Sequence, residues 1–281
     1  MSKLNIILAL TVVVTVCALF VPHTTIAGPH DLVVIRPGGA TASDEAQQNV
    51  NNLLKLIARA SGWPAESANA RYFNNENEGL RYIQATKPGF VLVTPGFYLK
   101  HRTKLNLTPV NKISLAGSTT SSFSVVAKKG TLSALADLKN KIVAGSSLSE
   151  PEFVQKIVFA GKLKLNADVK AKQMSGLPAL KALRAGDVDA VVLDAQEYQS
   201  LPALPFASEF TTIFTSKTIT NTGIMADGNN TDDAAIKAIA EATKEFCATP
   251  DGKNICTTFQ ITGFEPASER DCDELIKRWE K

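Results

Sequence analysis

Short apolar runs alternate with amphipathic segments along the chain from residue 31 to about residue 193. The runs are bounded by glycine, proline or small polar residues, which is typical of buried strands. Between them, apolar positions recur at helical spacing, which indicates helices packed by one face. Strands are predicted at 31–35, 90–93, 110–116, 123–127, 141–144, 169–174 and 190–193, and helices at 43–62, 78–86, 152–160, 177–185, 233–246, 252–259 and 270–281.

Single strands that alternate with single helices predict an α/β protein with parallel sheets and helices on both faces. The alternation starts afresh near residue 121, so two lobes are expected. The segment after residue 217 has no sheet partner of its own and is expected to return to the first lobe. We therefore predict lobe 1 over 28–117 plus 217–281, and lobe 2 over 118–216. Two crossings make a hinge, and the cleft between two lobes commonly binds a small ligand.

The first 27 residues have the layout of a cleaved secretory signal. Lys3 supplies a positive start, residues 5–21 are almost wholly apolar, and Thr25-Ile26-Ala27 places small side chains where a signal peptidase reads. We expect a cut after Ala27 and an extracytoplasmic location. Two alternatives are a membrane anchor, since the apolar stretch is nearly long enough to span a bilayer, and a lipoprotein anchored at Cys17.

Charge and cysteine content narrow the functional classes. The net charge of +3 falls to +2 without Lys3, which argues against a nucleic-acid partner. Outside the signal, Cys247, Cys256 and Cys272 allow one disulfide in an oxidising compartment, with the pairing open, or three buried thiols. Their spacing is not that of metal ligands, and we expect no metal and no cofactor.

Three loops follow predicted strands and precede predicted helices, where ligands of open α/β sheets bind. Hydroxyls and free backbone N–H groups at such a helix start can bind an anion without a charged side chain. The serine loop 145–149 is the strongest candidate, and simple N-capping by Ser149 is its alternative. The candidate ligand-binding residues in the three loops are Gly39, Thr94, Tyr98, Ser146, Ser147 and Ser149.

Three candidate ligand-binding residues could instead have a purely structural role. Tyr98 and Thr94 could contact a ligand or serve only in packing. Asp194 follows the strand at 190–193 and could accept a hydrogen bond from a ligand amine, order the hinge or cap a helix.

Several segments resemble periplasmic solute-binding proteins. Residues 131–145 resemble the entry to their second lobe, and 180–191 resemble a segment with the pattern Gly-Asp-Val-Asp-Ala. Residues 249–253, 261–267 and 271–275 resemble the C-terminal end of the phosphate/phosphonate-binding branch. The resemblance implies a type 2 periplasmic-binding-protein fold with two Rossmann-like lobes. It also implies a monomeric periplasmic receptor that closes on a small ligand and delivers it to an ABC permease in the inner membrane.

In that branch, the loop equivalent to 145–149 resembles Ser-Thr-Ser-Gly, and its hydroxyls and amides hold the oxyanion. Glu150 and Glu152 replace neutral residues here, in the first turn of the predicted helix. Carboxylates at that position would repel a phosphate group, which counts against a simple phosphonate ligand.

An enzyme is the main alternative class. Ser146 or Ser147 could act as nucleophiles only with a base in reach, and His30 and His101 are the only histidines after residue 27. No G-x-S-x-G, H-E-x-x-H or phosphate-loop pattern occurs, so we expect no catalysis, and a periplasmic hydrolase remains only a remote alternative. A solute sensor or partner-binding protein of the same fold, without transport, stays open.

Overall fold

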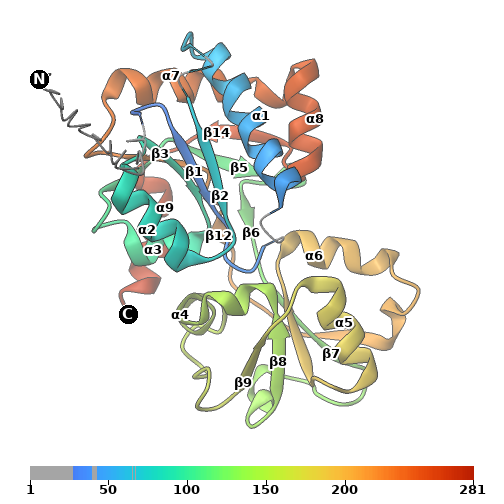
Figure 1. Cartoon of the computed structure of the whole chain (residues 1–281). Helices are drawn as coiled ribbons and strands as arrows, with labels where there is room; N and C mark the ends of the chain where they lie inside the picture. The colour runs from blue at the N-terminus through green and yellow to red at the C-terminus, as the bar shows by residue number, and fades with distance from the viewer. Residues whose placement is uncertain (1–27, 40–42, 65, 67) are drawn as a thin grey trace, which may run out of the picture.

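The computed structural model describes residues 28–39, 43–64, 66 and 68–281. The predicted signal sequence, with Cys17 and the cut after Ala27, lies outside these residues. The described chain forms two α/β lobes, one above the other in Figure 1. Each lobe is built on a five-stranded sheet.

The sheet of lobe 1 has the strand order β2-β1-β3-β13-β4. Its central strands are almost wholly buried, because helices cover both faces. Its strands are β1 (Leu32–Ile35), β2 (Ala70–Phe73), β3 (Phe90–Val93), β4 (Leu107–Pro109) and β13 (Ile224–Asp227).

The sheet of lobe 2 has the strand order β11-β7-β10-β8-β9. Its strands are β7 (Ser124–Lys128), β8 (Ile142–Gly145), β9 (Lys170–Gln173), β10 (Ala190–Leu193) and β11 (Phe210–Thr215).

Both sheets are mixed, so the prediction of parallel sheets is wrong. β13 runs antiparallel to β3 and β4, and β7 runs antiparallel to β10 and β11. Both strands follow a crossing between the lobes. A strand that enters from the hinge has no βαβ crossover that would force it parallel.

Two short pairings lie where the chain passes between the lobes. β6 (Thr120–Ser121) pairs antiparallel with β12 (Ile219–Thr220), and β5 (Asn111–Ser114) pairs antiparallel with β14 (Gly263–Pro266). The Ser121 hydroxyl donates to Asn221 Oδ1 at 2.6 Å beside this double crossing. The exact division of the chain at 117/118 and 216/217 remains our proposal.

The helices of lobe 1 divide between two apolar clusters. α1 (Asp44–Ala60), capped by Ser43 and buried along the predicted face, packs with α7 (Asp233–Lys244) and α8 (Pro250–Phe259) on one cluster. α2 (Glu76–Thr86) and α3 (Pro95–His101) pack on the other. Trp63 follows α1 and stacks on the His30 ring at 3.9 Å.

A disulfide joins Cys247 to Cys256, across the turn that leads into α8. The sequence allowed three pairings, and the structure selects this one. Cys272 is a free, buried thiol. Burial raises the pKa of this thiol to about 11.

The helices of lobe 2 depart from the prediction in two places. The helix predicted at 152–160 is a single α-turn, α4 (Pro151–Phe153), followed by a π-helix at Val154–Val158. α5 (Gly176–Ala185) ends as predicted at Gly186, whose φ of 88° is left-handed and favours glycine. α6 (Ala195–Ser200) was not predicted.

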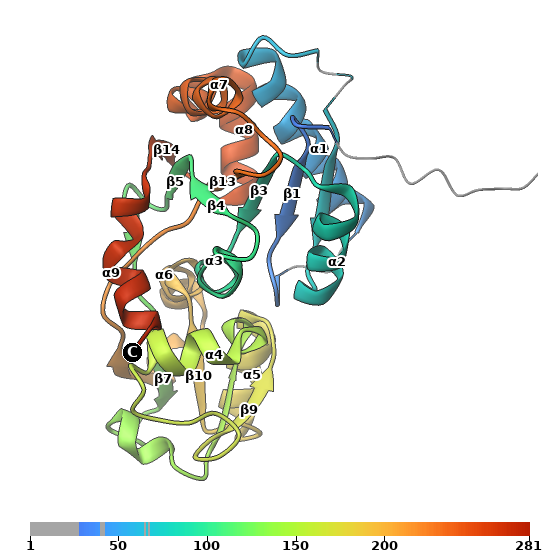
Figure 2. The same cartoon turned by 90° about the vertical axis from the view of Figure 1, so that its left-hand side faces the viewer.

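The last helix, α9 (Glu269–Trp279), runs from lobe 1 to lobe 2, as Figure 2 shows. Its end is fixed to lobe 2, because Lys156 Nζ donates to the Trp279 carbonyl at 3.0 Å and Arg278 Nη2 donates to the Ile157 carbonyl at 3.0 Å. One apolar cluster continues from lobe 1 through α9 into lobe 2. Among the described residues, no helix has the length and apolar character needed to cross a membrane.

Candidate functional site

The loop after β1 lies directly against the serine loop of lobe 2. Gly38 has a left-handed φ of 72°, and a Cβ at this position would collide with the Ser146 carbonyl and lie 2.7 Å from Ser149 Oγ. Only glycine meets both conditions. The neighbouring Gly39 donates its N–H to the Arg36 carbonyl at 2.9 Å and is half-buried. The lobes therefore touch through backbone at this point.

The loop after β3 makes a second contact with lobe 2. The Thr94 hydroxyl accepts from the Phe97 N–H at 3.3 Å, as the N-cap of α3, and donates to Glu150 Oε1 at 2.7 Å. A side chain at Gly96 would collide with the Glu150 carboxylate. The glycine therefore leaves the space that this carboxylate fills, and Thr94 holds it there.

Glu150 is the most deeply buried carboxylate of this region, with 9% of its surface exposed. Burial raises its pKa to about 7, and the negative charge of Glu76 acts in the same direction. Hydrogen bonds from Thr94 and the Phe97 backbone, and the charge of Lys100, oppose this rise. The carboxyl therefore exchanges its proton near neutral pH.

The predicted serine loop forms a turn of 3₁₀-helix over Ser146–Ser149. The Ser146 hydroxyl donates to Glu197 Oε1 at 2.9 Å. The Ser149 hydroxyl donates to the Ser146 carbonyl at 2.8 Å, so its predicted alternative as an N-cap is wrong. Ser147 Oγ is one of two buried side-chain polar atoms that lack a hydrogen-bond partner within the described parts of the chain.

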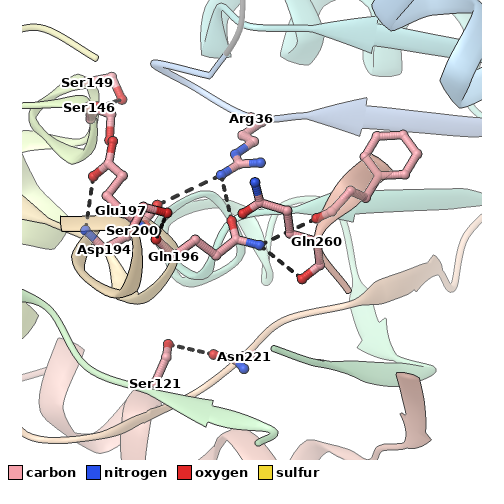
Figure 3. A network of polar contacts seen from close by, with 11 residues as sticks. Arg36, Ser121, Ser146, Ser149, Asp194, Gln196, Glu197, Ser200, Asn221 and Gln260 are labelled. Atoms are coloured by element: carbon pink, nitrogen blue, oxygen red, sulfur yellow. Dashed lines mark hydrogen bonds and ion pairs between the residues drawn. The ribbon is translucent and has the colours of Figure 1, made fainter. Parts of the chain in front are cut away.

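Asp194 begins α6 and belongs to the polar network of Figure 3. Its carboxylate accepts from the Glu197 N–H at 2.8 Å, and Glu197 Oε2 accepts from the Asp194 N–H at 3.1 Å. This reciprocal pair is a capping box, so the helix-cap alternative describes its local role. Burial raises the pKa of Glu197, and the nearby Asp194 charge adds to the rise.

The same network crosses between the lobes. Arg36 Nη2 donates to Gln196 Oε1 at 3.2 Å and lies 3.8 Å from Asp194 Oδ2. Gln196 Nε2 donates to the carbonyls of Phe259 and Gln260, at 3.4 and 3.3 Å. Figure 3 shows these side chains reaching one another from opposite lobes. The lobes are therefore joined by direct polar contacts, and we call this arrangement the closed form.

Tyr98 lies away from these contacts, in the core of lobe 1. Only 1% of its surface is exposed, and its hydroxyl lies beside the Cys272 thiol. Burial raises the pKa of the Tyr98 phenol. In the closed form Tyr98 has no surface for a ligand, so its position favours the packing alternative.

A cavity of about 390 Å³ opens beside Glu150 between the lobes. It is rich in amides and carboxylates. Its one lysine, Lys100, is already paired with Glu76 at 2.7 Å. His101 Nε2 also lies 2.9 Å from Glu76, and these two partners hold the pKa of Glu76 down to about 2. The cavity is lined by Pro37, Asn74, Asn75, Glu76, Asn77, Gly96, Lys100, Ser149, Glu150, Pro151, Glu152, Phe153, Gln173 and Trp279.

The structure thus brings Thr94, Ser146 and Ser149 to the contact between the lobes. Sequence reasoning missed Arg36, Gln196 and Glu197. The spacing Asp194-x-x-Glu197 is itself a capping-box signal, which could have located α6. No comparable signal marked Arg36.

A family model described as the periplasmic substrate-binding protein of phosphonate ABC transporters matches residues 40–272. Comparison with curated proteins found no significant match.

Solved structures with the same fold include a Xanthomonas citri protein bound to ATP (TM-score 0.71, 14% identity, covering 89% of this chain and 97% of that one). A binding-protein component of a Pseudomonas aeruginosa ABC phosphonate transporter has a TM-score of 0.68 at 13% identity, over 88% of this chain and 84% of that one. A Prochlorococcus marinus protein in complex with methylphosphonate has a TM-score of 0.65 at 15% identity, over 89% of this chain and 97% of that one. The family match spans most of the chain, and the chain belongs to the periplasmic substrate-binding proteins of phosphonate-type ABC transporters.

Proposed function

We propose that this chain holds a small polar solute between its two lobes and delivers it to an ABC permease in the inner membrane. The observation that carries the proposal is the meeting of three strand-end loops between the lobes, in a chain of this family. Two structural neighbours hold methylphosphonate and ATP, which are phosphorus oxyanions, and this supports a polar solute that could be oxyanionic.

We assign the solute to the space around Thr94, Ser146, Ser147 and Ser149, with the backbone of the loop at Gly39 beside it. The unpartnered Ser147 hydroxyl supports this assignment, because a buried polar atom without a partner is costly and a ligand can satisfy it. Asp194 acts through α6 and orders the lobe contact. Tyr98 is left out because it is buried.

We further propose that the mature protein begins after Ala27 and works in the periplasm as a monomer without a cofactor. The Cys247–Cys256 disulfide supports an oxidising compartment. Ser146 donates to a carboxylate and Ser149 to a carbonyl, rather than to a histidine, which supports binding rather than nucleophilic catalysis.

A thermal-shift screen of residues 28–281 tests this function. The solutes would be phosphate, phosphonates, sulfate, amino acids, polyamines and vitamins. A ligand at about 100 times its dissociation constant stabilises the fold by about 2.7 kcal/mol, which raises the melting temperature by several degrees. A shift with one solute class, without turnover, is the expected result. If no class shifts it, the solute-receptor proposal fails.

The variant Ser147→Ala tests the site. We expect it to weaken binding of the solute found in the screen by about 1–2 kcal/mol, roughly one hydrogen bond to a charged group. Unchanged affinity in calorimetry would place the solute away from this loop.

A further inference from the structure

We propose that Glu150 sets the ligand class of this receptor. Its carboxylate occupies the place between the loops where a solute's anionic group would sit, and it thereby excludes dianionic oxyanions such as phosphate and methylphosphonate from the closed form. The inference rests on the proposed function and narrows its solute class.

The first support is the position of the carboxylate. Glu150 belongs to lobe 2, yet its Oε1 accepts the Thr94 hydroxyl of lobe 1 at 2.7 Å, and the Phe97 backbone also donates to it. A hydroxyl and a backbone N–H are the donors that an oxyanion ligand would use. Gly96 supplies the space, since any side chain there would collide with the carboxylate.

The second support comes from the serine loop. The Ser146 hydroxyl, another donor expected to bind an oxyanion, already donates to the half-buried carboxylate of Glu197 at 2.9 Å. Thus one hydroxyl from each lobe already donates to a carboxylate of the chain itself. An entering oxyanion would have to displace both carboxylates to gain these donors.

The third support is the charge around the site. Lys100 is paired with Glu76 at 2.7 Å, and Arg36 is engaged by Gln196 and Asp194, so neither cation is left to neutralise a dianion. At pH 8, above the pKa of Glu150, its carboxylate is ionised and carries the same sign of charge as a dianion. Like charges in a site that is poorly exposed to water repel strongly. A solute that donates hydrogen bonds to Glu150, through an amine or hydroxyl groups, meets no such repulsion. The fitting class is therefore amine-bearing or polyhydroxylated.

Calorimetry at pH 8, where Glu150 is ionised, tests the proposal with methylphosphonate and with sulfate on the mature wild-type protein and on Glu150→Gln. The glutamine keeps the shape of the side chain and its ability to accept from Thr94, but removes the charge. We expect Glu150→Gln to bind these oxyanions at least about tenfold more tightly than wild type, a difference of about 1.4 kcal/mol. Glu209→Gln is the matched control. It removes one negative charge from the same lobe, at a side chain paired with Arg184 at 2.9 Å and away from the cavity lining, and should leave affinity unchanged.

The proposal is overturned if Glu150→Gln gains nothing over wild type, whether both bind the oxyanions or neither does. It is also overturned if Glu209→Gln gains equally, since the effect would then be one of net charge. A variant that fails to fold is recognised by circular dichroism, and Glu150→Ala then takes its place in the same comparison. Failure of the receptor function is a separate result, because it requires that no solute of the thermal screen shifts wild type.

Discussion

Glu150 is a carboxyl group that its surroundings hold close to its neutral form. A residue is rarely buried with an unpaired charge, and here one hydroxyl, one backbone N–H and the charge of Lys100 offset the loss of water only in part. The consequence is a group that titrates in the range where most proteins are studied. It links the contact between the lobes to proton concentration.

We predict that stability falls as pH rises through the window between about 4.5 and about 7. The unfolded carboxyl ionises near its ordinary pKa of 4.5, whereas the folded one holds its proton up to about 7. The folded state therefore binds more protons than the unfolded state in this window, so the free energy of unfolding falls as pH rises. The total loss, reached above about pH 7, is on the order of 3 kcal/mol. Urea unfolding of wild type and Glu150→Gln from pH 4.5 to 8 measures how the free energy of unfolding depends on pH.

The variant should show a clearly shallower slope than wild type. Glu197, whose pKa is also raised, contributes to both proteins alike. Glu76 has its pKa lowered to about 2, so the stability that it contributes is lost only as pH falls below about 4.5, outside the window. Equal slopes for the two proteins would show that Glu150 ionises normally.

The sequence located the donors of the candidate site but not their partners. Thr94, Ser146 and Ser149 follow predicted strands, and the rule that ligands bind at strand ends selected them. Glu150 was recognised as unfavourable for an anion. Its bond to Thr94, 56 residues away in the sequence, depends on how far the lobes close, which no local pattern encodes.

At the scale of elements, the strongly periodic segments were predicted well and the short ones were not. The seventeen residues of α1 show their apolar face and cap directly in the sequence. α6 has six residues and no buried side chain, so it has no apolar periodicity to detect. The π-helix at Val154–Val158 keeps buried positions that resemble those of an α-helix, and the sequence pattern could not separate the two.

The disulfide should stabilise the end of lobe 1. Cys247 and Cys256 are nine residues apart, and closing a loop of this length removes chain entropy worth about 2–3 kcal/mol from the unfolded state. The double variant Cys247→Ser/Cys256→Ser should therefore lose about this much in guanidinium unfolding. Reductant should destabilise wild type by a similar amount and leave the double variant unaffected. An equal response of both would assign the effect to Cys272.

Two aspartates that cap helices allow the local effect of a cap on stability to be distinguished from its effect on the contact between the lobes. Asp194 caps α6 beside Arg36, and Asp232 caps α7 by accepting from the Ala235 N–H at 2.8 Å. Replacing either by alanine should cost about 1 kcal/mol of stability. Only Asp194→Ala should also weaken the contact between the lobes, which small-angle scattering would detect as a larger radius of gyration. If both variants had the same radius of gyration, Asp194 would have no role in the contact between the lobes.

At the scale of the molecule, the resemblance to a two-lobed binding protein was confirmed by the family match and by the structural neighbours. The mixed sheets were missed because strand direction is set by the route of the chain through the hinge. That route depends on pairings such as Val91 with Met225, which join distant segments.

Closure should depend on the small space at Gly96. We expect Gly96→Ala to push Glu150 away from Thr94 and to shift the protein towards an open form with a larger radius of gyration in scattering. Gly263→Ala is the control, because a Cβ there meets only Ser114 Cβ, at an ordinary 3.9 Å. If both variants keep the wild-type radius, the carboxylate can be accommodated elsewhere and does not hold the lobes together.

The course of α9 across the lobes gives the protein a built-in optical reporter. The chain contains two tryptophans. Trp63 lies in lobe 1, stacked on His30, whereas Trp279 lines the cavity between the lobes with Lys156 of lobe 2 4.8 Å from its ring centre. Movement of lobe 2 therefore changes the surroundings of the Trp279 indole and leaves those of the Trp63 indole unchanged. In a Trp63→Phe protein, the emission of Trp279 alone would follow opening and closing in real time, without an attached dye.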